Sequence, residues 1–257
     1  MSTKSAVARL RADASLASLH RSLDVYYGDP ARDAAMDRLY ASFLQPGDIA
    51  FDIGSHVGDR VGAFLRAGAR VVALEPQPDC ARVVRQIYSS DQDVTVIEQA
   101  CGPKPGILTL HINSQNPTVT TASTDFVRAA DGAGGWEGQV WDRAIEVSVT
   151  TVDRLIEAYG IPQFIKIDVE GFEDDVLAGL TQRVPALSFE FTTIQRDVAL
   201  KCLNRLAALG PYTFDLALGE SQVMTFGKRV ELKAMADHIA GLPHSANSGD
   251  VYAVLER

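Results

Sequence analysis

Several acidic side chains stand at the ends of apolar segments, which is where an α/β protein places residues that bind ligands. Asp52 and Glu75 each end an apolar run, and Asp168 and Glu170 follow a third. Because the carboxyl ends of parallel strands meet along one edge of a sheet, these side chains are expected to face one crevice. Carboxylates in a crevice can accept hydrogen bonds from hydroxyls, attract a cation or take up a proton.

A turn containing glycine follows the first of these acids. Residues 49–58 read Ile-Ala-Phe-Asp-Ile-Gly-Ser-His-Val-Gly, so Gly54, Ser55 and Gly58 lie between an apolar strand and an expected helix. Glycines let the backbone approach a ligand closely. A strand, turn, helix and strand in this order bind a nucleotide-like ligand. Glu75, at the end of the second strand, can then accept hydrogen bonds from both hydroxyls of a ribose.

The turn favours S-adenosylmethionine (SAM) over a dinucleotide. A pyrophosphate-binding turn has the pattern Gly-x-Gly-x-x-Gly, whereas this one reads Gly54-Ser-His-Val-Gly58. Asp52 would repel a diphosphate and attract the sulfonium and ammonium of SAM. The turn around Ala100, after a third apolar strand, is expected from its position to face the adenine. Turns of this kind also occur without a ligand in many α/β folds.

Asp168 and Glu170 are candidates for the chemistry in this crevice. They are two residues apart beyond a strand end, and Gly171 permits a sharp turn there. The pair could hold a divalent cation such as Mg²⁺ that binds substrate hydroxyls, or one carboxylate could act as a base with its pKa raised by the other. Alternatively, Asp168 orders the SAM ammonium or the loop, while Glu170 caps the next helix.

Glu190 and His56 are further candidates for the catalytic base. Glu190 lies near the end of an apolar strand, with a core hydrogen bond or a helix entry as an equal alternative. His56 has an imidazole that titrates near neutrality, although a histidine in a turn is commonly a hydrogen-bonded spacer. Lys166 alternates with Asp168 on its strand, and pairing with a neighbouring carboxylate is its simplest role.

The 257 residues suit one α/β domain, residues 45–257, preceded by a helical extension, residues 1–44. Strands and helices alternate along the domain, which indicates a doubly wound, mostly parallel sheet. The last two expected strands, residues 212–218 and 250–255, have little helical pattern between them. They therefore indicate an antiparallel pair or insertion at one edge of the sheet.

Two regions lie outside this pattern. Residues 5–44 have apolar side chains at helical spacing, with a break at Gly28-Asp-Pro30. This extension could cap the ligand site, form the surface of a homo-oligomer, or simply pack on the sheet edge. Residues 113–143 are rich in Thr, Ser, Gly and Asn and contain Trp136 and Trp141. Long loops are usually functional or disordered, so a lid and a disordered excursion are both open alternatives.

The composition, with 46% hydrophobic and 22% charged residues, is that of a soluble globular protein. A net charge of −9 argues against a nonspecific nucleic-acid binder. Apolar runs stay well short of the roughly 20 residues of a membrane span, and residues 1–14 lack the apolar segment of an export signal. Cys80, Cys101 and Cys202 are widely spaced, as expected of buried thiols in a reducing compartment. We therefore expect a cytoplasmic protein.

Residues 164–173, Phe-Ile-Lys-Ile-Asp-Val-Glu-Gly-Phe-Glu, resemble the signature of the FkbM-type SAM-dependent methyltransferase family. The order and spacing of three further stretches agree with it: residues 51–58, 73–78 and 147–155. The resemblance implies a Rossmann-like class I methyltransferase fold with a seven-stranded sheet. It also implies SAM as cofactor and, most often, methylation of a hydroxyl on a sugar or natural product. His56 stands where family members often have a small residue, which would alter access to the methyl group.

Two other functions are compatible with such a sheet. A nucleotide-dependent oxidoreductase would use the same crevice, although the sequence has neither the diphosphate glycine pattern nor a Tyr-x-x-x-Lys pair. A SAM-binding scaffold without catalysis would keep the glycine turn and the ribose acid. The motifs specify neither the acceptor molecule nor its reacting atom.

Overall fold

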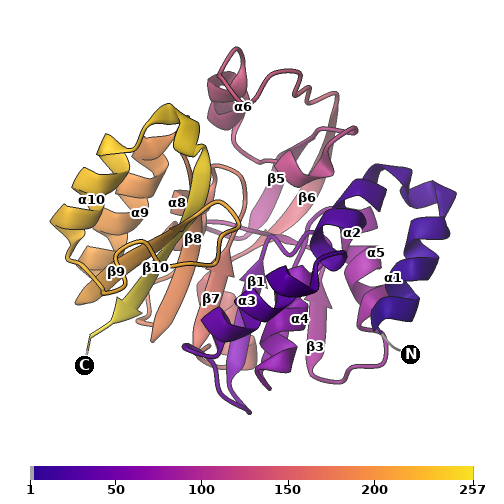
Figure 1. Cartoon of the computed structure of the whole chain (residues 1–257), viewed down its shortest axis with the longest axis horizontal. Helices are drawn as coiled ribbons and strands as arrows, with labels where there is room; N and C mark the ends of the chain where they lie inside the picture. The colour runs from indigo at the N-terminus through magenta and orange to yellow at the C-terminus, as the bar shows by residue number, and fades with distance from the viewer. Residues whose placement is uncertain (1–2, 257) are drawn as a thin grey trace.

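The computed structural model describes residues 3–256, and its centre is a seven-stranded sheet of order β3-β2-β1-β7-β8-β10-β9 (Figure 1). The strands are β1 (Ile49–Ile53), β2 (Arg70–Leu74), β3 (Val94–Ile97), β7 (Phe164–Ile167), β8 (Ala186–Thr192), β9 (Tyr212–Leu218) and β10 (Ser248–Leu255). β10 pairs antiparallel with β8 and with the edge strand β9, and the other pairings are parallel. The expected doubly wound, mostly parallel sheet with antiparallel pairing at one edge is confirmed.

The central strand β1 lies between β2 and β7, where the direction of winding reverses. Phe51 and Ile53 pack into the hydrophobic core on one face, and Ala50 packs into the core on the other. Asp52 shares the face of Ala50 by strand alternation and is in register with Lys166 of β7. A switch point of this kind opens a crevice at the carboxyl ends of the strands.

Helices cover both faces of the sheet. One face carries α3 (Pro30–Tyr40), α4 (Asp59–Arg66) and α5 (Pro78–Ile87), and the other carries α7 (Val152–Tyr159), α8 (Glu173–Ala178), α9 (Arg196–Leu209) and α10 (Leu232–Gly241). The expectation of little helix between the last two strands is wrong. Met235 and Ile239, one helical turn apart on α10, are fully buried in the core that α9 shares.

The N-terminal extension is helical, as expected. It comprises α1 (Thr3–Ala12), a 3₁₀ segment (Ala14–Leu19), α2 (His20–Tyr27) and α3. Asp29 caps α3, and Pro30 occupies its first turn, so the sequence break at residues 28–30 is the boundary between α2 and α3. α1 contacts α5 and α3 contacts α4, so the extension packs against the helices on one face of the sheet (Figure 1). None of the helices among residues 3–256 is long and apolar enough to cross a membrane.

A second, three-stranded sheet stands beside the crevice, with the order β4 (Ala100–Cys101), β6 (Arg143–Thr150), β5 (Gly106–Ile112). The chain between β5 and β6 is folded rather than a disordered excursion, and it contains a 3₁₀ turn (Pro117–Val119) and α6 (Thr124–Ala130). Phe126 is buried there between Trp136 and Trp141, which meet its ring edge-on. Both tryptophans therefore belong to a local hydrophobic cluster.

Candidate active site

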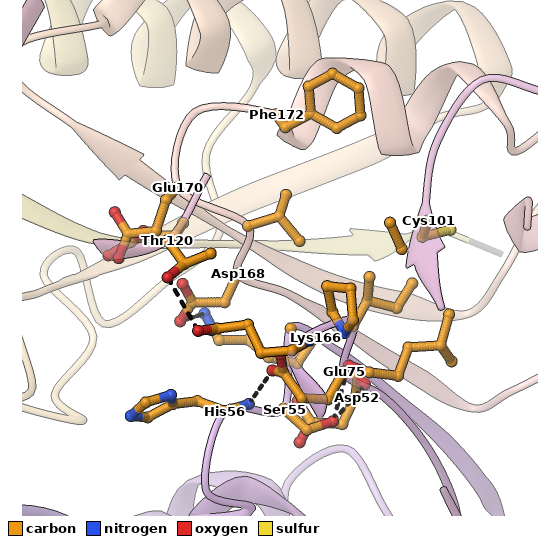
Figure 2. Close-up of a pocket in the computed structure, with 18 of the residues that line it drawn as sticks. Asp52, Ser55, His56, Glu75, Cys101, Thr120, Lys166, Asp168, Glu170 and Phe172 are labelled. Carbon is orange, nitrogen blue, oxygen red and sulfur yellow. Dashed lines mark hydrogen bonds and ion pairs between the residues drawn. The ribbon is translucent and has the colours of Figure 1, made fainter. Parts of the chain in front are cut away.

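A pocket opens at the carboxyl ends of the central strands, between the main sheet and the second sheet (Figure 2). Its free space, including the open mouth, is about 990 Å³. The sequence-based candidates that line it are Asp52, Gly54, Ser55, His56, Glu75, Ala100, Asp168, Glu170 and Glu190. The structure thus brings together residues that are up to 138 positions apart in the chain.

The glycine turn after β1 owes its path to two glycines with positive φ. Gly54 has φ +87°, and a β-carbon at this residue would lie 1.8 Å from the carbonyl oxygen of Asp168. Gly58 has φ +83° and begins α4, where a β-carbon would press on Val84 and Tyr88 at 3.1–3.3 Å. Gly58 does not lie on the pocket wall, so its part is to shape the turn.

Ser55 lines the pocket, but its hydroxyl and its amide both donate hydrogen bonds to backbone carbonyls of β1 and β2. Its hydroxyl donates to the carbonyl oxygen of Asp52 at 2.9 Å and lies 3.2 Å from that of Leu74. Its amide also donates to Leu74, at 3.0 Å. Ser55 therefore ties the end of β1 to the end of β2 and fixes the shape of the turn.

Glu75 is held rigidly at the end of β2. Its two carboxylate oxygens accept the backbone N–H groups of His56 and Gln77, each at 2.8 Å (Figure 2). Burial outweighs these hydrogen bonds and raises the pKa of Glu75 to about 8. Each oxygen retains a lone pair, so a pair of ribose hydroxyls could donate to this carboxylate.

Asp52 is buried in the floor of the same pocket, and one of its carboxylate oxygens lacks a hydrogen bond. Its Oδ2 atom has no hydrogen-bond partner within residues 3–256. Burial, reinforced by the charge of Asp59, raises the pKa of Asp52 to about 7. An unpartnered buried carboxylate is costly, and a cationic or N–H-bearing ligand would relieve that cost.

Lys166 confirms the expected pairing with carboxylates. It is 1% exposed and forms ion pairs with Asp250 of β10 and, at 3.1 Å, with Asp168. Burial disfavours the ionised form of Asp168, but the Lys166 ammonium outweighs that effect and lowers the pKa of Asp168. Asp168 is therefore ionised in the pocket.

The turn after β7 presents Glu170 to the pocket. Glu170 and Gly171 both have positive φ, +54° and +85°. Glu173 accepts the amides of Val169 at 3.0 Å and Gly171 at 3.1 Å, which closes the turn before α8. The N-cap position of α8 is Phe172, so Glu170 does not have the helix-capping role considered for it. Thr121 donates its hydroxyl to the Glu170 carbonyl at 2.6 Å, which anchors the segment before α6 to this turn.

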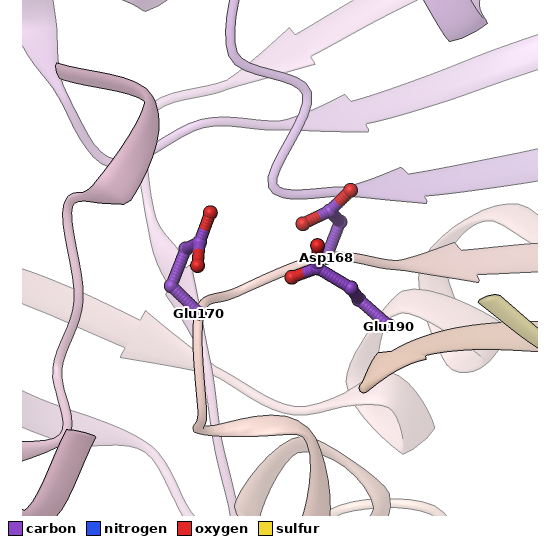
Figure 3. A group of neighbouring side chains, drawn as sticks. All are labelled: Asp168, Glu170 and Glu190. Carbon is purple, nitrogen blue, oxygen red and sulfur yellow. The ribbon is translucent and has the colours of Figure 1, made fainter. Parts of the chain in front are cut away.

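Asp168, Glu170 and Glu190 form a group of three carboxylates (Figure 3). Each contributes an oxygen that lies within 4.8 Å of the others. Burial and the charge of Asp168 raise the pKa of both Glu170 and Glu190 well above its usual value. Such a group can accept a proton or surround a cation.

His56 lies on the opposite wall, with φ +48°. Its Nδ1 is 3.7 Å from the Cys80 sulfur, its Nε2 is 3.5 Å from the Thr118 hydroxyl, and Tyr26 meets the ring edge-on at 5.9 Å. Burial lowers the pKa of His56 to about 4. The imidazole is therefore neutral at physiological pH.

Several residues that line the pocket were not among the sequence-based candidates. Arg60 pairs with Asp59 at 2.6 Å and with Glu220 at 3.0 Å, which joins α4 to the loop after β9. Tyr26 reaches the pocket from the N-terminal extension. Asp59 and Arg60 directly follow the glycine turn, so their position could have marked them as pocket residues. No local sequence pattern marks Tyr26 or Glu220.

Comparison with known proteins decides the family. Residues 52–199, more than half of the chain, match the model of the Methyltransferase FkbM domain. The chain belongs to the FkbM methyltransferase family. It is a SAM-dependent methyltransferase, and the oxidoreductase alternative is set aside. Hexuronic acid methyltransferase AglP of Haloferax volcanii is 24% identical over 196 residues, which cover 75% of each protein.

Solved structures of other methyltransferases are similar to this FkbM methyltransferase only at a distance. An O-methyltransferase from Bacillus cereus in complex with SAH (S-adenosylhomocysteine) has 14% identity and a TM-score of 0.45, with 93% of this chain and 91% of that chain covered. A TehB-like SAM-dependent methyltransferase from Corynebacterium glutamicum has 9% identity and a TM-score of 0.46, with 86% and 88% covered.

Proposed function

We propose that this FkbM methyltransferase transfers the methyl group of SAM to a hydroxyl oxygen of a sugar or natural product. The observation that carries the proposal is the group Asp168, Glu170 and Glu190, which lies in the same pocket as the ribose acid Glu75. A hydroxyl is a weak nucleophile until its proton leaves, so an acceptor of this kind requires nearby groups that take up the proton. The activity named for AglP, on a hexuronic acid, supports a sugar as acceptor.

In this proposal SAM lies across the carboxyl ends of the strands. Glu75 accepts the ribose hydroxyls, and Asp52 faces the ammonium and sulfonium charges. Ala100, on the wall of the second sheet, borders the adenine. Gly54 lets the backbone approach the methionine portion, while Ser55 and Gly58 keep the turn in shape.

The chemistry needs alignment and the removal of one proton. The acceptor oxygen forms a bond to the methyl carbon as the carbon–sulfur bond breaks, which leaves S-adenosylhomocysteine. Alignment of the two groups at about 3 Å supplies several kcal/mol of barrier lowering. The proton passes to a carboxylate among Asp168, Glu170 and Glu190, which are also the groups that could bind Mg²⁺. We assign His56 to the pocket wall, because a pKa of about 4 makes it a weak base.

We further propose that the acceptor extends into a second hollow between α2 and the chain before α6. This hollow shares Tyr26 and Thr118 with the main pocket. Its other lining residues are mostly polar: Ser18, Arg21, Ser22, Val25, Gln115 and Asn116. Hydroxyl, amide and guanidinium groups are suited to hydrogen bonding with a sugar.

Calorimetric titration with SAM and SAH tests the cofactor site. The wild type should bind both, and Glu75→Ala should weaken binding by roughly tenfold or more, about 1.4 kcal/mol. Glu157→Ala, which removes an exposed carboxylate from α7, is the control and should bind like the wild type. Binding that is indifferent to Glu75 would remove it from the ribose site.

Acceptor screening then tests the reaction. SAH formation is followed with uronic acids, neutral sugars and amines, and the methylated atom is identified by NMR. Methylation of a hydroxyl is the expected result. Methylation of nitrogen would contradict the O-methyl proposal, and bound SAM without SAH formation on any acceptor class would favour the scaffold alternative.

A further inference from the structure

Three carboxylates from two neighbouring strands converge on one point. Asp168 and Glu170 come from the turn after β7, and Glu190 comes from β8, which pairs with β7. One oxygen of each lies within 4.8 Å of the others (Figure 3). Oxygen ligands at about 2.0–2.6 Å from a common ion are separated by up to about twice that distance, so this spacing suits a single divalent cation.

Glu170 supplies a second, independent observation. Its side chain is only 8% exposed, and its Oε2 atom has no hydrogen-bond partner in the described part of the chain. Its carboxylate points toward Asp168 and Glu190 (Figure 3). The left-handed backbone of Glu170, and the hydrogen bonds that Glu173 accepts from the amides of Val169 and Gly171, hold it in that position. A buried oxygen without a partner costs free energy that a ligand would recover.

Lys166 is the neighbouring cation, and it pairs with Asp168 but not with the two glutamates. Lys166 divides its charge between Asp250 and Asp168. Within residues 3–256, no lysine or arginine forms an ion pair with Glu170 or Glu190. A divalent cation, in contrast, would contact all three carboxylates at once.

We propose that Asp168, Glu170 and Glu190 bind one divalent cation, Mg²⁺ or Mn²⁺, that orients the methyl acceptor. Three hard oxygen ligands suit these ions better than zinc, and an octahedral ion would keep positions for two acceptor oxygens. The cation would also favour loss of the acceptor proton. This acceptor role rests on the proposed O-methylation, whereas the cation site itself does not.

Titration with Mn²⁺, followed by electron paramagnetic resonance in the presence of SAH, tests the site. The wild type should bind one ion per chain. Glu170→Gln and Glu190→Gln, which keep shape and remove charge, should each weaken Mn²⁺ binding by at least about tenfold. Glu220→Gln is the matched control, because it removes a carboxylate from the same pocket without touching the three ligands, and its Mn²⁺ affinity should stay near that of the wild type. SAH binding shows that each variant is folded.

The outcomes separate the cation site from the proposed function. No saturable Mn²⁺ binding, or equal binding by the wild type and both glutamine variants, would overturn the site. A loss as large in Glu220→Gln would overturn it too, because general pocket charge would then explain the binding. Specific binding of one Mn²⁺ ion, with no methyl transfer to any hydroxyl, would support the cation site and contradict the proposed O-methylation. Methyl transfer to a hydroxyl that continues in EDTA, together with no Mn²⁺ binding, would support O-methylation and overturn the cation site.

Discussion

Gly54 and Asp168 are in backbone contact: a β-carbon at residue 54 would lie 1.8 Å from the Asp168 carbonyl oxygen. The turn expected to hold SAM and the turn expected to hold the acceptor are therefore built against each other. Gly54→Ala must move one of them, and it also strains a residue with φ +87°. We predict a loss of roughly 3 kcal/mol or more in the free energy of unfolding, measured in urea, together with loss of SAH binding.

Gly47→Ala is the matched control for Gly54→Ala. Gly47 has a similar φ of +92°, but nothing lies within 4 Å of the position of its β-carbon. It should lose only about 1–2 kcal/mol from backbone strain and keep SAH affinity. Equal losses in the two variants would show that the contact with Asp168 is unimportant.

SAH affinity should depend on pH through Glu75 and Asp52. Burial raises their pKa values to about 8 and about 7, and hydroxyl donors and cations favour the ionised carboxylates. Binding below these values must displace protons, so affinity should rise between pH 6 and 8 by up to about tenfold per pH unit for each proton released, and level off above. Calorimetry across this range checks the slope, and Glu75→Gln should flatten it. A wild-type affinity independent of pH would contradict the prediction.

Whereas SAH affinity should rise with pH, the contribution of Glu75 to the stability of the ligand-free protein should fall as pH rises. The pKa of Glu75 is about 8 in the folded chain and near the ordinary value of 4.5 when unfolded. The folded state therefore binds more protons between these values, and this group's contribution to stability is lost as pH rises through the window. Urea unfolding at pH 6 and pH 8 measures the change, and Glu75→Gln should reduce it. The free energy of unfolding should therefore change less favourably from pH 6 to pH 8 in the wild type than in Glu75→Gln. An equal or more favourable change in the wild type would be inconsistent with a raised pKa of Glu75.

Lys166→Met should be strongly destabilising. Lys166 is the buried partner of Asp250 and Asp168, and its removal leaves two carboxylates near one another without their cation. Removal of one partner from a buried ion pair costs about 3–5 kcal/mol. Denaturant unfolding measures this loss, and the double variant Lys166→Met with Asp250→Leu should recover part of it. A single variant as stable as the wild type would show that the ion pairs contribute little.

Arg21→Ala tests the proposed acceptor hollow. The variant should raise KM for a sugar acceptor several-fold while leaving SAH affinity unchanged, because Arg21 lines the second hollow and not the SAM pocket. Arg9→Ala, on the exposed face of α1, is the control. Steady-state kinetics with the identified acceptor measures the effect. An unchanged KM would exclude Arg21 from acceptor binding.

The part of the pocket proposed to bind SAM could be located from sequence because its residues are close along the chain. Asp52, Gly54 and Glu75 belong to one strand-turn-helix-strand unit, and local patterns place each of them at the end of a strand or in the turn between. The alternation of strands and helices likewise predicted the doubly wound sheet. The helix between the last two strands was not predicted, because only two of its residues, Met235 and Ile239, are buried and the surrounding segment is rich in charged residues.

The part of the pocket proposed to hold the acceptor depended on tertiary structure. Glu190 joins Asp168 and Glu170 only because β8 pairs with β7, and Lys166 finds Asp250 only because β10 inserts between β8 and β9. Residue spacing could not show that Glu173 accepts the amides of the turn while Glu170 faces the pocket. Local periodicity encodes which residues form a strand or a helix, whereas the order of strands in the sheet determines which distant side chains meet. By itself, the sequence determined the family and the acids proposed to bind the cofactor, and the fold decided which carboxylates lie together.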